Sequence, residues 1–114
     1  MELKSREFGE NLALIHVSGR LTLEDIHRFE KEFEKFTGNK KSIGLELSGL
    51  KYIDSSGIGS LIKSMNMAKK LSIELMLIDI DAMIINIFKL AYLDKFFNIM
   101  TLEDLKNKYP DLKI

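Results

Sequence analysis

The segment Asp54-Ser55-Ser56-Gly57-Ile58-Gly59 holds the residues of this chain that are best placed to do chemistry. Two hydroxyls follow a carboxylate, and the glycines at 57 and 59 remove side chains from the next turn and allow another backbone to approach. The segment lies between a predicted strand and a predicted helix, where open α/β sheets place their sites. Free amides and a partial positive charge at a helix start suit a phosphate. Asp54 or Ser55 could instead simply cap the helix, so both interpretations remain open.

The predicted helix runs from Gly57 to about Lys70. Its apolar residues recur at spacings of three and four, which places them on one buried stripe: they are Ile58, Leu61, Ile62, Met65 and Ala68. The residues off this stripe should be exposed and should meet any partner: they are Ser56, Ser60, Lys63, Met67 and Lys70. Met67 is then either one exposed apolar side chain among many or an adaptable contact.

The N-terminal half predicts strands at residues 2–8 and 11–18, joined in a hairpin by Gly9-Glu10. Thr22 and Asp25 have the spacing of a capping box, so a helix should begin there and end at Gly38. Its apolar stripe is Leu23, Ile26, Phe29, Phe33 and Phe36. Residues 43–47 predict another strand, and residues 49–57 predict the loop that follows it.

The C-terminal half continues the alternation of strands and helices. Residues 73–78 are nearly all apolar, as in a strand covered on both faces. A third helix is marked by Ile84, Ile87, Phe88 and Ala91, and a short strand at 97–100 and a helix from Thr101 follow. This order predicts an α/β fold with a mixed, mostly parallel sheet and amphipathic helices packed on it, in one domain over residues 1–114.

Composition narrows the classes of partner. Of the 114 residues, 17 are basic and 17 acidic, so there is no net field to hold nucleic acid or an anionic membrane. The chain has no cysteine and no apolar run near the twenty residues of a membrane span. We therefore expect a cytoplasmic protein.

Residues 49–61, GLKYIDSSGIGSL, resemble the signature of bacterial anti-sigma factor antagonists, which are STAS domains. The resemblance implies that an anti-sigma factor with serine kinase activity phosphorylates the serine directly after the aspartate, Ser55, with Ser56 as the fallback. It also implies that the unphosphorylated chain binds this anti-sigma factor and frees the sigma factor. Phosphorylation would end the binding, and a PP2C-like phosphatase would restore the serine.

On this interpretation the chain is a kinase substrate and a binding protein rather than an enzyme, with no cofactor and no metal, and we expect a monomer. The expected partner contact comprises Asp54, Ser55, Ser56, Gly57, Ile58, Gly59, Ser60, Lys63 and Met67. The alternative is a STAS domain that never switches and serves as a structural or small-ligand module of a transport or stress-signalling complex.

Three positions depart from the family pattern and leave the identity of the partner open. Gly19-Arg20-Leu21-Thr22 stands where members often carry an acidic residue. The proline that often opens the third helix is missing from residues 79–83, and Ala91-Tyr92-Leu93 replaces a small-residue-Gly-Leu step.

Other polar residues suggest weaker sites. Asp79 and Asp81 follow a strand and, with Asp54, could suggest a divalent cation, although Asp81 more simply caps the third helix. His16 and His27 are far in sequence from any obvious set of metal ligands.

Overall fold

Strands and helices alternate along most of the chain, and the computed structural model describes residues 1–112. The elements are β1 (Glu2–Phe8), β2 (Leu12–Leu21), α1 (Ile26–Thr37), β3 (Ser42–Glu46), β4 (Leu50–Ile53), α2 (Ser55–Lys70), β5 (Glu74–Ile78), α3 (Ala82–Leu90), β6 (Asn98–Met100) and α4 (Leu102–Lys108). The predicted α/β class with a mixed sheet is confirmed. None of the helices within residues 1–112 has both the length and the hydropathy to cross a bilayer.

The sheet has the strand order β1-β2-β3-β5-β6, and β4 pairs with β2 outside this path. β1 and β2 form the predicted antiparallel hairpin, and Gly9 turns the chain between them with a φ of 65°. All other pairs are parallel, as right-handed crossover connections through helices require.

The far end of β2 leaves β3 and pairs with β4, and this change of partner positions the candidate site. Residues 12–16 pair with β3, whereas Gly19, Arg20 and Leu21 pair with β4 after a register shift at Gly19/Arg20. Gly19 has a φ of 83°, which glycine adopts without strain, and its N–H donates to the Gly49 carbonyl over 2.9 Å. β4 therefore ends beside the end of β2, and Asp54 follows it directly.

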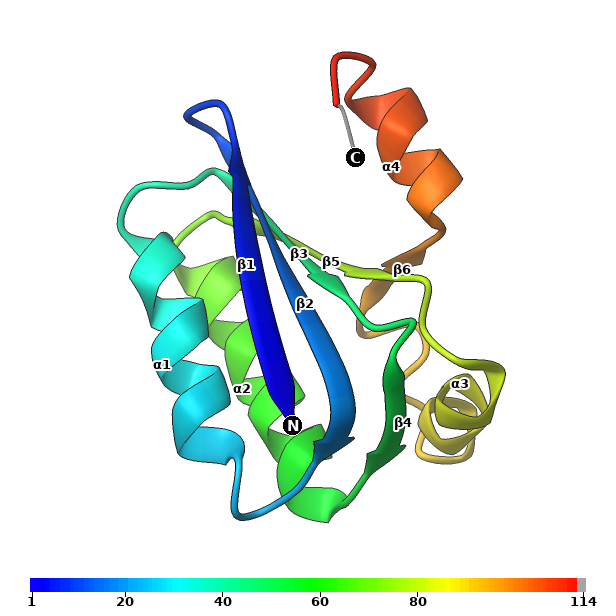
Figure 1. Cartoon of the computed structure of the whole chain (residues 1–114). Helices are drawn as coiled ribbons and strands as arrows, with labels where there is room; N and C mark the ends of the chain where they lie inside the picture. The colour runs from blue at the N-terminus through cyan, green and yellow to red at the C-terminus, as the bar shows by residue number, and fades with distance from the viewer. Residues whose placement is uncertain (113–114) are drawn as a thin grey trace.

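Helices cover both faces of the sheet. α1 and α2 lie side by side on one face of the sheet, whereas α4 lies on the other face (Figure 1). On the first face Ile15 and Val17 of β2 share a buried cluster with Phe29 and Phe33 of α1. On the second, the buried residues are Leu12, Leu14, Met76, Ile78 and Leu105. β5 is buried on both faces, which explains its almost continuous apolar sequence.

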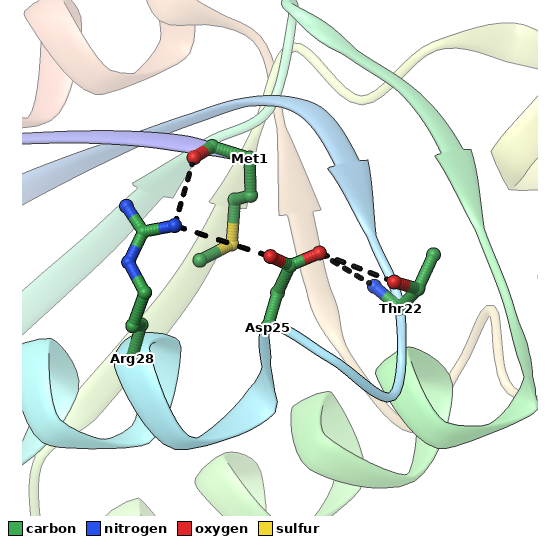
Figure 2. A network of polar contacts seen from close by, with 4 residues as sticks. All are labelled: Met1, Thr22, Asp25 and Arg28. Atoms are coloured by element: carbon green, nitrogen blue, oxygen red, sulfur yellow. Dashed lines mark hydrogen bonds and ion pairs between the residues drawn. The ribbon is translucent and has the colours of Figure 1, made fainter.

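The first helix begins at Ile26, four residues after the predicted start at Thr22. The Asp25 carboxylate accepts hydrogen bonds from the Thr22 hydroxyl at 3.2 Å and from the Thr22 N–H at 3.4 Å, and Arg28 connects it to the Met1 carbonyl (Figure 2). These contacts close a turn over residues 22–25 instead of a helical turn. Leu23, predicted on the buried stripe, is 65% exposed, so that part of the prediction is wrong.

One further boundary and the buried stripe of α3 also differ from the prediction. The predicted loop at residues 49–57 contains β4 and the start of α2, because Leu50 and Ile53 turn into the core while Lys51 and Tyr52 face outward. In α3, Ile84 and Phe88 are buried as expected, but Ile87 is 39% exposed and Ala91 only caps the helix end.

Candidate functional site

Asp54 connects the start of α2 to the turn that precedes α1. One carboxylate oxygen accepts the Gly57 N–H at 2.8 Å, and the other accepts the Leu23 N–H at 3.1 Å. Asp54 is therefore the N-cap of α2, which decides between the two capping candidates. The pKa of Asp54 is lowered chiefly by the Gly57 N–H. Burial opposes this effect, and the Leu23 N–H lowers the pKa by a smaller amount, so that the pKa lies below its ordinary value.

Ser55 is the first residue of α2 and is exposed, whereas Ser56 is half-buried. The Ser55 hydroxyl lies at the N-terminus of a 16-residue helix, where the backbone dipoles favour negative charge. Ser55 is therefore more accessible from solvent than Ser56.

The two glycines of the segment differ in function. A Cβ atom on Gly57 would lie 2.4 Å from the Leu21 carbonyl oxygen and 2.7 Å from Cγ1 of Ile53, so the absence of a side chain lets α2 pack onto the ends of β2 and β4. A Cβ on Gly59 would meet nothing within 4 Å. The expected close approach of another backbone is confirmed at Gly57 and is wrong at Gly59.

Three residues predicted on the exposed side of α2 are not fully exposed: Ser56, Ser60 and Met67. Ser60 is 3% exposed and donates to Glu30 of α1 at 2.9 Å, while Met67 is half-buried and packs against the core. Lys63 is exposed and donates to the same Glu30 at 3.1 Å. Burial raises the pKa of Glu30, but the hydrogen bonds from Lys63 and Ser60 outweigh it and lower the pKa overall.

The other polar candidates lie apart from the Ser55 loop in their contacts: the two aspartates bond backbone N–H groups, and His16 bonds Glu46. Asp79 accepts the Leu102 N–H at 2.9 Å, and Asp81 caps α3 by accepting the Met83 N–H at 2.9 Å. His16 Nδ1 lies 3.0 Å from a Glu46 oxygen, and His27 is exposed on α1. The structure therefore explains both aspartates by the helix starts that they stabilise.

A hollow of about 410 Å³ beside the Ser55 loop was missed by the sequence reasoning. It is lined by Arg20, Thr22, Leu23, Glu24, Tyr52 and Asp54. The Arg20 guanidinium lies 4.4 Å from the centroid of the Tyr52 ring. The spacing of Thr22 and Asp25 could have predicted this hollow, because it fits a closed turn that exposes Leu23 as well as it fits a capping box.

Acidification should remove the stabilising effect of the Asp54 cap. Because the folded pKa lies below its ordinary value of 3.8, the carboxylate stabilises the fold above that pH and stops doing so as the pH falls through the folded pKa. The free energy of unfolding of Asp54→Asn, measured by urea denaturation, should fall furthest below that of the wild type near pH 7. The difference should shrink below about pH 4.

Asp111→Asn is the control, because Asp111 is exposed in the turn after α4 and caps no helix. A difference between the Asp54 variant and the wild type that is the same at pH 7 and at pH 3 would contradict this role of the carboxylate charge.

Comparison with known proteins places this geometry in a family. The sequence profile of the STAS domain matches residues 5–106. The fold is similar to that of the anti-sigma factor antagonist SpoIIAA in its unphosphorylated form, with a TM-score of 0.78, 15% identity, and 99% of this chain and 100% of that one covered. The phosphorylated form of SpoIIAA, a Bacillus cell fate determinant, has a TM-score of 0.74 at 15% identity, over 95% of this chain and 99% of that one.

Two other solved structures have a similar fold. An anti-sigma factor antagonist from Mycobacterium paratuberculosis has a TM-score of 0.81 at 17% identity, over 96% of this chain and 94% of that one. SLC26A9 has a TM-score of 0.67 at 17% identity, over 76% of this chain but only 17% of that much longer protein. These likenesses establish the fold, and the profile match establishes that the chain belongs to the STAS domain family.

Proposed function

We propose that this chain is an anti-sigma factor antagonist controlled by phosphorylation of Ser55. The observation that carries the proposal is the exposed Ser55 hydroxyl on the first residue of α2, directly after the Asp54 cap. SpoIIAA, whose fold is similar over the whole chain, is an anti-sigma factor antagonist with a phosphorylated and an unphosphorylated form. Without its phosphate, this chain would bind an anti-sigma factor and release the sigma factor.

The physical setting supports a phosphate at Ser55 that does not disturb the fold. The dipole of α2 attracts the anion at the start of the helix, whereas the Asp54 carboxylate, which already accepts the Gly57 N–H, repels it. The two effects oppose each other, so the added charge changes the surface that a partner meets more than it changes the fold.

The roles that follow need no reaction by the chain itself. An anti-sigma factor with serine kinase activity adds the phosphate, and a PP2C-like phosphatase removes it, so the chain is substrate and ligand. We propose that it acts as a monomer, as one STAS domain, in the cytoplasm. The contact surface includes Asp54, Ser55, Gly59 and Lys63, with the half-buried Ser56 and Ile58 at its edge.

The similarity to part of SLC26A9 favours one alternative, a STAS domain that works as a fixed module of a larger assembly. In that case phosphate never turns over at Ser55.

The proposal is tested by locating the phosphate. Each serine-kinase anti-sigma factor of the source genome is incubated with the chain and ATP, and the modified residue is mapped by mass spectrometry. We expect one phosphate on Ser55, none on Ser55→Ala, and an unchanged Ser55 phosphate on the matched variant Ser56→Ala. Phosphate on Ser56 alone, phosphate outside residues 54–59, or no phosphate with any of the kinases would refute the proposal.

A further inference from the structure

Two large side chains that line the hollow beside the Ser55 loop are exposed to solvent. Leu23 is 65% exposed and Tyr52 is 47% exposed, although both are large and apolar enough to favour burial. Single exposed apolar residues are common, but here two of them flank the same hollow of about 410 Å³.

Arg20 lies on the same hollow and is held in place without a counter-ion. Its guanidinium lies 4.4 Å from the Tyr52 ring centroid, and within residues 1–112 no carboxylate lies within ion-pair distance of it. Stacking on an aromatic ring orders a guanidinium and leaves its N–H donors free for a planar anion such as a carboxylate. Arginine and aromatic side chains of this kind are the residues that dominate binding energies at protein interfaces.

Hydrogen bonds connect the turn that lines the hollow to the loop that carries Ser55. The Asp54 carboxylate that caps α2 also holds the Leu23 N–H at 3.1 Å, so the turn that carries Leu23 is fixed relative to Ser55. A partner centred on Ser55 would therefore meet a preformed hollow and would not have to order it.

The charges on its rim have opposite signs. Glu24 is exposed on the hollow together with Arg20, while both oxygens of Asp54 already accept backbone N–H groups. A matching surface needs a carboxylate opposite Arg20 and a cation opposite Glu24, and such a pair of opposite charges fixes the orientation of a partner.

We propose that this hollow accepts an apolar side chain of the anti-sigma factor, flanked by a carboxylate that pairs with Arg20 and a basic group that pairs with Glu24. The inference rests on the proposed function and adds Arg20, Leu23 and Tyr52 to the contact as residues that determine which partner binds. A second possibility for Arg20 is that it pairs with the phosphate of modified Ser55 in the same chain, and the test separates the two.

The test measures the affinity of unphosphorylated variants for the anti-sigma factor that phosphorylates or binds the wild type. We expect Arg20→Gln and Leu23→Ala each to weaken binding by about tenfold to a hundredfold, and Arg20→Glu by more. Replacement of the partner's matching carboxylate by lysine should restore binding to Arg20→Glu but not to Leu23→Ala. A merely structural role of Arg20 would not give this rescue.

Matched controls exist on the same chain. Arg6 is also exposed and also lies over an aromatic ring, at 5.1 Å from the centroid of Phe8. It pairs with Leu14, six residues before Arg20 on β2, which places it about 20 Å away. Arg6→Gln and Leu71→Ala, at the far end of α2, should each change the affinity by less than about twofold.

The outcomes separate this inference from the proposed function. If the anti-sigma factor bound the wild type and the Arg20 and Leu23 variants with equal affinity, the inference would be overturned and the proposed function would stand. An effect of Arg20→Gln only on the phosphorylated form would assign Arg20 to the phosphate and overturn the inference as well. If no anti-sigma factor bound the wild type, both would fall.

Discussion

Phosphorylated at Ser55, the chain should bind its anti-sigma factor at least about a hundredfold more weakly than the unmodified chain does. Phosphoserine adds about −1.5 to −2 charges at pH 7 at a position that now carries a neutral hydroxyl. Asp54 precedes it, and the neighbouring hollow is lined by Glu24 and Arg20, whose charges offset each other, so the phosphate would make the local surface more acidic.

The loss should arise at the interface rather than from unfolding. A partner surface that is complementary to a hydroxyl and to glycine backbone would have to desolvate a dianion without a matching cation, which commonly costs several kcal/mol. Each 1.4 kcal/mol corresponds to a tenfold change in affinity. The start of α2, by contrast, tolerates the anion, so the melting temperature should change by only a few degrees.

Calorimetric titration of the anti-sigma factor into both forms at matched salt measures this effect. Ser55→Ala should bind nearly as well as the unmodified chain. Ser55→Asp should weaken binding less than phosphate does, because a carboxylate has less charge and a different shape. Equal affinities of the phosphorylated and unmodified forms would remove the switch and favour the fixed-module alternative, provided that circular dichroism shows both to be folded.

Sequence patterns predicted those elements whose periodicity is set by burial. The apolar run at 73–78 became the doubly buried β5, and the spacing of Phe29, Phe33 and Phe36 became the buried stripe of α1. The sequence limited the cap of α2 to Asp54 or Ser55, and the structure decides for Asp54, whose carboxylate accepts the Gly57 N–H three residues later.

Two of the errors concern residues that make contacts about thirty positions away in sequence. Leu23 was predicted to be buried, but its N–H bonds Asp54, 31 residues later. Ser60 was predicted to be exposed, but it bonds Glu30 on the adjacent helix, 30 residues earlier. Helical periodicity describes one element and contains no information about which polar side chain on another element will satisfy a hydroxyl or an amide.

The two glycines of the loop also differ in contacts that the sequence does not reveal, and substitution of Gly57 has the largest expected effect on stability. Gly57 and Gly59 look equivalent in sequence, yet a Cβ on Gly57 would come within 2.4 Å of the Leu21 carbonyl oxygen. That oxygen belongs to the backbone of β2 and cannot rotate away, so either α2 or the end of β2 must move. Overpacking of this kind costs about 1 to 3 kcal/mol.

Gly57→Ala should therefore lower the melting temperature by roughly 5 to 15 °C, since each kcal/mol corresponds to several degrees in a domain of this size. Gly59→Ala is the matched control, because it makes the same chemical change two residues later, where a Cβ meets nothing within 4 Å. Alanine favours a helix over glycine by up to about 1 kcal/mol, so this variant should melt a few degrees higher than the wild type. Thermal unfolding followed by circular dichroism would show the two shifts with opposite signs. Two variants that both melt above the wild type would mean that α2 does not need the close approach at Gly57, and the packing that positions Ser55 would have to be explained differently.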